Sequence, residues 1–440
     1  LPISIMKKII FMLLTAGFPL MVGAQTLTLR QCIDRAVARN VSVRQAQVGQ
    51  QQQKIALESA KQARLPQVGA SLNQNLSLGR GLTANNTYDT RNTYSSSLGV
   101  HADMPLFTGF RIGNERKRAE LNLKAATADI ERLSESLGLQ VTQAYFQVLY
   151  QQELLQQAKT NLQLSQLQES RLVGLIQAGK AAQVELSEAQ SRVAQDQASI
   201  VQEESQYNLA LLELSQLLEF STPDSLHIAS PASLQLPHLP ESADAVFALA
   251  LPQRPALQVA KLRTEAAQMG VKVARSGYLP SLSLSAGLGT NYYNTSGFPN
   301  EAFNRQIRNN LASSLALSLS FPIFDRYSTR NSVKQAKLEV VNQQLEEENL
   351  KKTLYKEIQN AYYNAVAAQQ KWAAAKTAEQ ASETTLNLVT KKYEAGKANG
   401  TEYDEARKKH TNAATQRLTA YYDYMFRTKI LDFYAGEPLQ

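Results

Sequence analysis

Residues that build covalent, metal or catalytic centres are scarce in this sequence. Cys32 is the only cysteine among 440 residues, so no disulfide can form within the chain, and we interpret it as a small buried hydrophobe near a helix start. The four histidines lack the spacing of metal ligands. Neither a Gly-rich phosphate loop nor a G-x-S-x-G nucleophile turn is present. We therefore assign no catalytic residue, cofactor or metal ligand, and we expect that the protein is not an enzyme.

Runs of positive charge are also missing. The formal net charge is +8, yet the lysines and arginines are scattered along the chain. Proteins that bind nucleic acid usually concentrate such residues in a run or patch. The sequence therefore argues against nucleic acid as a partner.

Long apolar runs are confined to the N-terminus. Two lysines precede an apolar run at residues 9–22, and Val22-Gly23-Ala24 has the small-residue pattern of a cleavage site. We expect a signal peptide at residues 1–24. No later stretch approaches the ~20 apolar residues of a spanning helix. The exported chain would then be either soluble or inserted in a membrane through strands.

Proline is absent from two long intervals, one between Pro105 and Pro223 and the other between Pro322 and Pro438. Both are rich in Ala, Gln, Glu, Leu and Lys, which favour helix. Each carries an apolar stripe with helical steps, which repeats after 217 residues: Leu133, Leu137, Val141, Ala144 and Val148, then Leu350, Leu354, Ile358, Ala361 and Ala365. We predict helices of about 65 residues, roughly 100 Å long, which suit a coiled-coil assembly better than a globular core.

These intervals belong to a longer internal duplication. Residues 106–121 (LFTGFRIGNERKRAEL) align with residues 323–338 (IFDRYSTRNSVKQAKL) at a shift of 217. The same shift places Ala178-Gly179-Lys180 on Ala395-Gly396-Lys397, where we expect helices to end and turn. A unit used twice favours a wall or conduit over a single catalytic cleft.

The two copies are joined by a proline-rich segment. We predict a first repeat at residues 25–220, a linker or equatorial region at 221–256, and a second repeat at 257–440. The linker holds six of the fourteen prolines. It also contains Leu226-His227-Ile228, which we expect to form a short strand.

Four segments alternate apolar and polar residues with a period of two. They lie at about 67–78, 94–105, 280–290 and 311–321, and about ten residues cross a bilayer when the strand is tilted. The alternative is a soluble sandwich with one wet face, but only four strands are present, each flanked by helix. Proline suits a change from helix to strand, and we expect these boundaries at Pro66, Pro105, Pro280 and Pro322.

Four strands cannot close a barrel, and lipid does not tolerate open sheet edges. Chains would therefore share one barrel. Two chains would supply eight strands, whose side chains largely fill the interior, and three would supply twelve, which leaves a lumen. The strand face rich in Ser, Asn and Gly would line that lumen.

Several motifs recur in a specific order. They are TLRQCIDRAVARN, the two (R/Y)LP junctions, the two P-(L/I)-F strand exits, QAYF and NAYY, and the two AGK turns. With these motifs the chain resembles the TolC-like outer-membrane efflux and secretion family over about residues 27–436. The resemblance implies an α+β membrane protein of the Gram-negative outer membrane with a periplasmic extension. It also implies a homotrimer with a twelve-stranded β-barrel, a long α-helical coiled-coil tunnel and an equatorial belt.

The resemblance further implies partners. A periplasmic adaptor (membrane fusion protein) and an inner-membrane transporter would dock on the tunnel, and the channel itself would be passive. Its tip would be formed by the AGK turns, with Gly179, Lys180 and Gly396 facing the adaptor. Drugs, metal ions and proteins remain open as cargo.

The family's gate positions can be carried over to this chain. Glu402 and Glu405 match an acidic ring that faces the lumen, although an ordinary solvated helix face would look the same in sequence. Tyr393 matches a tyrosine that closes the tip by bonding an acidic residue, here Glu185. Ala398 stands where the family has a gate arginine, and the adjacent Lys397 is the candidate substitute.

Two other functions compete with an exit duct. A periplasmic coiled-coil adaptor or structural protein would share the helical hairpins but lack strand pairs of bilayer length. A secreted enzyme finds no support among the ionisable residues. Extraction separates these classes, because only the duct requires detergent.

Overall fold

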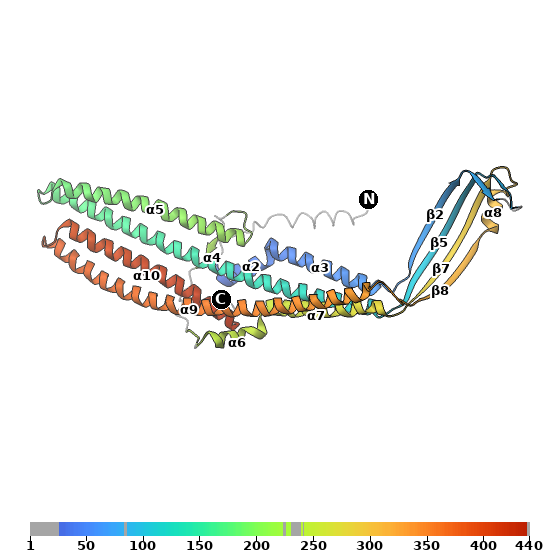
Figure 1. Cartoon of the computed structure of the whole chain (residues 1–440). Coiled ribbons are helices and arrows are strands. Elements are labelled where there is room, and N and C mark those ends of the chain that lie inside the picture. The colour runs from blue at the N-terminus through green and yellow to red at the C-terminus, as the bar shows by residue number, and fades with distance from the viewer. Residues whose placement is uncertain (1–25, 83–85, 223–225, 230–238, 241, 438–440) are drawn as a thin grey trace, which may run out of the picture. The chain divides into compact units, whose positions relative to one another are not determined.

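The computed structural model describes residues 26–82, 86–222, 226–229, 239–240 and 242–437. The predicted signal peptide lies outside these residues. The chain divides into two compact units (Figure 1). Among the described residues, the helical unit takes those of 26–44, 133–253 and 354–437, and the strand unit takes those of 45–132 and 254–353. Each unit takes segments from both repeats, because each repeat's longest helix runs through both units.

Four long helices dominate the helical unit (Figure 1). They are α4 (Arg111–Gln177), α5 (Gln183–Leu217), α9 (Ser328–Glu394) and α10 (Gly400–Ala435). Helices α4 and α9 each contain 67 residues, close to the predicted 65. Most of the predicted stripe is buried, including Val141 and Ile358 at 0% exposure. The proline-free, helix-favouring composition therefore formed the expected rods, which pack through one apolar stripe.

The two AGK tripeptides end α4 and α9 in the same way. Gly179 and Gly396 both have a φ of +69°, a conformation that glycine adopts without a Cβ penalty. The next residue closes each turn, because the amides of Lys180 and Lys397 each donate to a helix carbonyl at 2.8 Å. A left-handed glycine followed by such an amide bond is a Schellman motif. It confirms the predicted helix ends.

The start of the described chain is anchored in the helical unit. Strand β1 (Thr26–Leu27) pairs in parallel with β6 (His227–Ile228), which confirms the short strand expected in the linker. The Tyr145 hydroxyl donates to the Ala229 carbonyl at 2.5 Å, and burial raises the pKa of Tyr145 to about 12. Helices α2 (Leu29–Arg39) and α6 (Ala243–Gln253) complete this region.

Cys32 is fully buried in α2 and forms no disulfide. Burial raises the pKa of its thiol to about 12, so the thiol stays protonated at neutral pH. A reactive cysteine is instead exposed and has a lowered pKa. The structural interpretation of this residue therefore fits.

The strand unit contains a four-stranded antiparallel sheet in the order β2–β5–β7–β8 (Figure 1). The strands are β2 (Gln67–Ser77), β5 (Thr93–Thr108), β7 (Ser281–Thr295) and β8 (Ala312–Ser320). Helices α3 (Val41–Gln62) and α7 (Pro255–Arg275) precede β2 and β7, the latter through the 3₁₀ turn η2 (Ser276–Tyr278). All four predicted strands are thus present.

Strand register gathers the apolar residues on one face of the sheet. Two rows across the sheet are Val68–Ala102–Ala286–Leu315 and Met104–Leu284–Leu317. The neighbouring rows are Gly69–His101–Gly287–Ser314 and Gln67–Asp103–Ser285–Ala316, and they form the opposite, polar face. The predicted alternation is therefore consistent across all four strands.

The predicted strand boundaries need correction. Strands β5 and β7 contain 16 and 15 residues, longer than the ten expected. Pro105 lies within β5 instead of ending it, at a point where the register shifts between Pro105 and Phe107. A proline lacks the ladder N–H, and such an irregularity accommodates it. The prolines at 66, 280 and 322 lie outside the strands, as predicted.

The two polar segments between the paired strands also have structure of their own. The first contains a small hairpin of β3 (Arg80–Leu82) and β4 (Tyr88–Thr90), and the second contains α8 (Phe303–Asn309). Gln306 of α8 is buried and bonds both backbone groups of Tyr293. In the described part of the chain, no helix combines the length and apolar character needed to cross a membrane.

Candidate functional site

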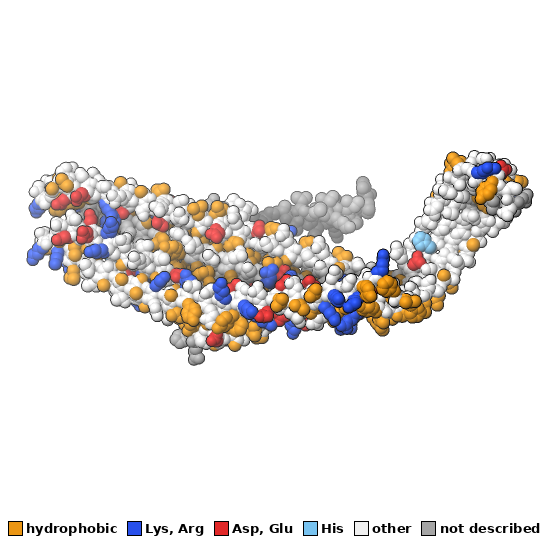
Figure 2. Space-filling model, in the orientation of Figure 1, with side chains coloured by type: hydrophobic (Ala, Val, Ile, Leu, Met, Phe, Trp, Pro, Cys, Tyr) orange, Lys and Arg blue, Asp and Glu red, His pale blue; other side chains and the backbone are white. Residues whose placement is uncertain are grey.

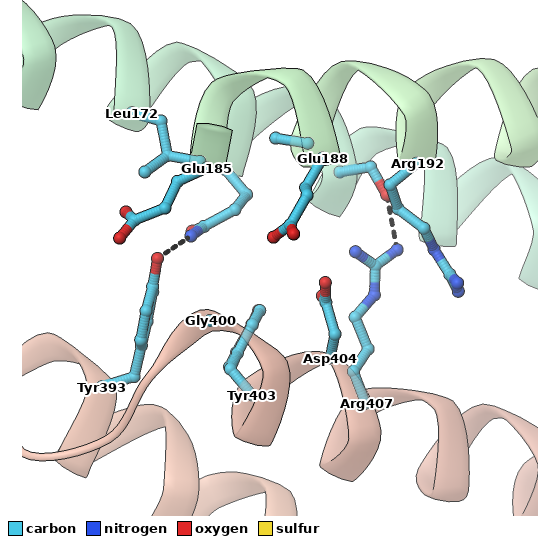
Figure 3. A pocket seen from close by; sticks show the side chains of 12 residues that line it. Leu172, Glu185, Glu188, Arg192, Tyr393, Gly400, Tyr403, Asp404 and Arg407 are labelled. Carbon is cyan, nitrogen blue, oxygen red and sulfur yellow. Dashed lines mark hydrogen bonds between the residues drawn. The ribbon is translucent and has the colours of Figure 1, made fainter. Parts of the chain in front are cut away.

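Helices α4 and α5 form one hairpin and α9 and α10 form a second, and both contribute to a small cavity near the AGK turns (Figure 3). Helix α4 supplies Ser165, Gln168 and Leu172, and α5 supplies Glu185, Glu188, Ala189 and Arg192. Across the cavity lie Tyr393 of α9 and Gly400, Tyr403, Asp404 and Arg407 at the start of α10. Segments more than 200 residues apart in sequence therefore meet at one site.

Tyr393 links the two hairpins, but through a different partner from the one predicted. The Gln168 side-chain amide donates to the Tyr393 hydroxyl oxygen at 3.1 Å. The predicted acceptor Glu185 lines the same cavity and points toward that hydroxyl (Figure 3). The Tyr393 pKa is raised, first by burial and then by the negative charge of Glu185. The tyrosine therefore remains protonated at neutral pH.

Tyr393 is also held by its ring. It stacks on Tyr403, with centroids 5.1 Å apart and planes 17° from parallel. One helical turn away, Arg171 and Glu394 form a second link between the hairpins, with N and O atoms 3.5 Å apart. This ion pair is largely solvated and contributes little. Tyr393 therefore contacts α4 through its hydroxyl and α10 through its ring.

A buried ion pair that sequence reasoning missed also links the hairpins. Arg407 of α10 contacts Asp196 of α5 at 2.9 Å, and their side chains are 6% and 10% exposed. The same guanidinium nitrogen donates to the Ser165 hydroxyl at 2.6 Å and to the Asn161 carbonyl at 3.0 Å. Ser165 donates to Asp196 in turn. The three side chains form a closed polar cluster between α4, α5 and α10.

The sequence did contain one signal for this cluster. At the shift of 217, Arg407 aligns with Gln190 and Asp196 aligns with Ala413. Neither charge is duplicated, in contrast to the pairs Glu185/Glu402 and Glu188/Glu405. A charge that is present in only one copy of the duplication, on a helix that packs against other helices, is a candidate for a specific interhelical contact. Gln168 gave no comparable signal, because glutamine is common throughout these helices.

Glu402 and Glu405 lie outside the cavity and are exposed. Asn399 caps α10 by accepting from the Glu402 amide at 2.8 Å, and an acidic residue in this first turn is favourable to the helix dipole. The cavity is lined instead by Asp404, Glu185 and Glu188. The predicted acidic pair therefore projects from a different face of α10 than the one that packs within the chain.

The remaining predicted site residues occupy the turns themselves. Gly179, Lys180, Gly396 and Lys397 are all exposed, and the amides of Lys180 and Lys397 close the two turns. Residues 26–82, 86–222, 226–229, 239–240 and 242–437 contain no cluster of three or more His, Cys, Asp or Glu able to hold a metal. The chemistry available at this site is the making and breaking of polar links between two hairpins.

Comparison with known proteins identifies the fold. A family model described as outer membrane efflux protein matches residues 32–218 and 246–437. The outer membrane efflux protein BepC of Brucella suis biovar 1 is 23% identical over 377 residues, which cover 85% of this chain and 77% of BepC. The pyoverdine export outer membrane protein OpmQ of Pseudomonas putida is 29% identical over 259 residues, which cover 55% of this chain and 54% of OpmQ.

Solved structures agree with this assignment. The structure of CusC superposes with a TM-score of 0.77 at 19% identity, covering 93% of this chain and 92% of that one. At such low identity the likeness establishes the fold alone. Strands and helices nevertheless correspond over nearly the whole length of both chains.

Proposed function

Since the chain belongs to the outer membrane efflux protein family, it is an outer-membrane efflux channel, and we propose that three copies form the exit duct of a tripartite efflux or secretion system. The family consists of transport channels rather than enzymes. In the proposed assembly, twelve strands close a barrel in the membrane, and twelve long helices continue it as a periplasmic tunnel. A periplasmic adaptor and an inner-membrane transporter dock at the AGK turns, around Gly179, Lys180 and Gly396.

The sheet carries this proposal. Strands β2 and β8 each pair on one side only, so each chain offers two edges with unsatisfied backbone groups. The apolar face is exposed, with Leu72 at 61%, Leu315 at 76% and Leu317 at 65%. Pairing β8 of one chain with β2 of the next satisfies both edges, and lipid covers the apolar face. Three chains supply enough strands to leave a water-filled lumen lined by the polar face.

The assembly state tests the proposal directly. We expect protein purified in mild detergent to scatter light as about three chains per particle after correction for bound detergent. Amide hydrogen exchange should then be slow in β2 and β8 as well as in the central strands. A monomeric particle whose four strands are nevertheless all protected would contradict the proposal, because its edges would be satisfied without partners.

We further propose that Glu402 and Glu405 form an acidic ring at the tunnel mouth. Both are exposed on one helix face, and three copies would place six carboxylates together. Such a ring attracts cations. Replacing both residues with Gln is expected to reduce selectivity for K⁺ over Cl⁻, measured as a shift in reversal potential in planar bilayers. The matched control replaces Glu204 and Glu213, which are exposed on α5, and an equal shift in both variants would rule out a local ring.

The tip is proposed to close through Tyr393 and Gln168. A neutral hydrogen bond contributes about 0.5–1.5 kcal/mol, and three copies act together in a trimer. Tyr393→Phe is expected to raise single-channel conductance, since the variant keeps the ring stack on Tyr403 but loses the hydroxyl. Gln168→Leu should have a similar effect, and the double variant should add little to either.

Glu185 provides the contrast in this experiment. Glu185→Gln removes a charge beside the Tyr393 hydroxyl but leaves the bond to Gln168 in place. Its effect on conductance is therefore expected to be smaller than that of Tyr393→Phe. An effect as large as that of Tyr393→Phe would mean that the tyrosine donates to Glu185 during closure, as the family resemblance implies. Unchanged conductance in all of these variants would show that Tyr393 does not close the tip.

A further inference from the structure

The basic residues that are scattered in sequence are gathered by the fold at one end of the sheet, where the strands meet the helices. Four segments lie where the helices of the strand unit meet its strands, and each includes adjoining residues of α3, α4, α7 or α9: residues 61–66, 109–118, 272–280 and 322–337. They hold twelve lysines and arginines against two acidic residues, Glu115 and Asp325. Their net charge of +10 exceeds the +8 of the entire chain. The rest of the protein is therefore slightly acidic.

We propose that these four segments form a basic collar that binds the phosphate groups of anionic phospholipids in the periplasmic leaflet of the membrane. The collar comprises Lys61, Arg64, Arg111, Arg116, Lys117, Arg118, Lys272, Arg275, Arg326, Arg330, Lys334 and Lys337. The inference rests on the proposed insertion of the sheet, because that insertion places the collar at a membrane surface.

Strand register brings the four segments to the same end of the sheet. The end of β5, the start of β7 and the end of β8 lie in one row, since Thr108 pairs with Ser281 and Ser281 pairs with Ser320. The start of β2 lies near that row, since Gln67 pairs with Asp103 of β5. Each collar segment is attached to one of these strand ends. A closed barrel would repeat the arrangement around its whole circumference.

The collar side chains are available to a ligand. All twelve are exposed. Arg111 pairs with Glu115 at 3.1 Å, whereas in the described part of the chain the other eleven form no ion pair. Asp325 is occupied in capping α9, where it accepts from the Thr329 amide at 2.7 Å. The excess positive charge is thus not neutralised within the protein.

Apolar side chains adjoin the collar. Phe110, Phe321, Ile323, Phe324 and Tyr327 lie in the same segments or beside them and are 57–96% exposed. Figure 2 shows Lys and Arg side chains next to a hydrophobic patch where the helices meet the strands. Aromatic residues at the headgroup level, with long cationic side chains beyond them, are the usual composition of a membrane interface. This pairing favours lipid over a purely aqueous polyanion.

The opposite end of the sheet has no such excess of positive charge. Its two connecting segments, residues 78–92 and 296–311, hold four arginines and two acidic residues. Their net charge is +2, compared with +10 for the collar. Attraction to phosphate is therefore specific to the end of the sheet that continues into the long helices, which is the periplasmic side in the proposed topology.

The test compares lipid binding by the whole protein and by two matched variants. The collar variant carries Arg116→Gln, Lys117→Gln, Lys334→Gln and Lys337→Gln. The control variant carries Lys391→Gln, Lys392→Gln, Lys408→Gln and Lys409→Gln, which are exposed residues of the helical unit. Native mass spectrometry in detergent measures the apparent Kd of added phosphatidylglycerol and of phosphatidylcholine for each protein.

Each Lys or Arg near an anionic membrane surface adds to the binding free energy. Removing four of them should therefore weaken phosphatidylglycerol binding by more than about tenfold. The control variant and the binding of phosphatidylcholine should change by less than about twofold. Conductance in pure phosphatidylcholine bilayers is expected in all three proteins, which shows that the collar variant still folds and inserts. In bilayers that contain phosphatidylglycerol, only the collar variant should lose the stabilisation conferred by that lipid.

Three results would overturn the proposal. Equal loss of binding in both variants would mean general attraction between opposite charges. Equal affinity of the unmodified protein for both lipids would mean that the collar does not select lipids by the net negative charge of their headgroups. Loss of binding to purified peptidoglycan, with lipid affinity unchanged, would assign the collar to the cell wall. Failure of the unmodified protein to conduct in any bilayer would instead contradict the proposed channel and is recognised separately.

Discussion

Replacing Leu317 with lysine is expected to prevent stable assembly in lipid, whereas the same replacement at Ser318 is expected to be tolerated. Leu317 lies near the middle of β8 in the apolar row with Leu284 and Met104. A lysine on the lipid face of a barrel costs about 2–4 kcal/mol near the bilayer midplane, and a trimer carries three copies. The loss per assembly is then about 6–12 kcal/mol.

Ser318 is a matched control because it is the next residue on the same edge strand and pairs with Ser283 on the polar face. Lysine there would point into water. Each variant is folded into phospholipid vesicles and then run on a gel without heating. The fraction that migrates as the assembled band measures the difference. Equal assembly of the two variants would show that the leucine face does not contact lipid.

Replacing Arg407 with methionine is expected to lower the free energy of unfolding of the helices by about 3–5 kcal/mol, the usual result of removing one partner from a buried ion pair. The Asp196 side chain, which is only 10% exposed, would lose its 2.9 Å contact. Arg192, whose guanidinium lies 3.4 Å from the other carboxylate oxygen, would offset part of the loss. Guanidinium denaturation followed by circular dichroism measures the change.

Two variants control this experiment. Combining Arg407→Met with Asp196→Leu removes both charges and should recover much of the stability, because an apolar pair can replace a buried ion pair at little cost. Arg427→Met removes a partly solvated pair with Asp423 on the same helix and should cost less than about 1 kcal/mol. If Arg407→Met costs no more than Arg427→Met, the buried cluster does not hold the hairpins together.

Much of the fold could be predicted from the sequence because its signals are local and repeated. The absence of proline and the apolar stripes gave the lengths of α4 and α9, and the Gly179 and Gly396 tripeptides gave their ends. Alternation gave the strands and their faces. Pro105 was misleading because a proline usually ends a strand, while neighbouring strands here accept a shift of register at that point.

The site was less predictable because it depends on which helix faces which. Tyr393 and Glu185 were found by resemblance and do share a cavity, but the hydrogen-bond partner is Gln168, a residue type without distinctive chemistry. The bond between Arg407 and Asp196 spans 211 residues, and no local pattern reports such a distance. The basic collar was missed for the same reason, since strand register rather than sequence proximity gathers its four segments.

The parallel pairing of β1 with β6 has a consequence for the order of folding. Thr26 pairs with His227, 201 residues further along the chain. The ribosome makes the N-terminal partner first, so β1 must wait unpaired until more than half of the polypeptide has been synthesised and has reached the same compartment. Closing so large a loop is entropically costly and slow. Strand β1 therefore cannot reach its native position until β6 has been made, long after β1 itself has emerged.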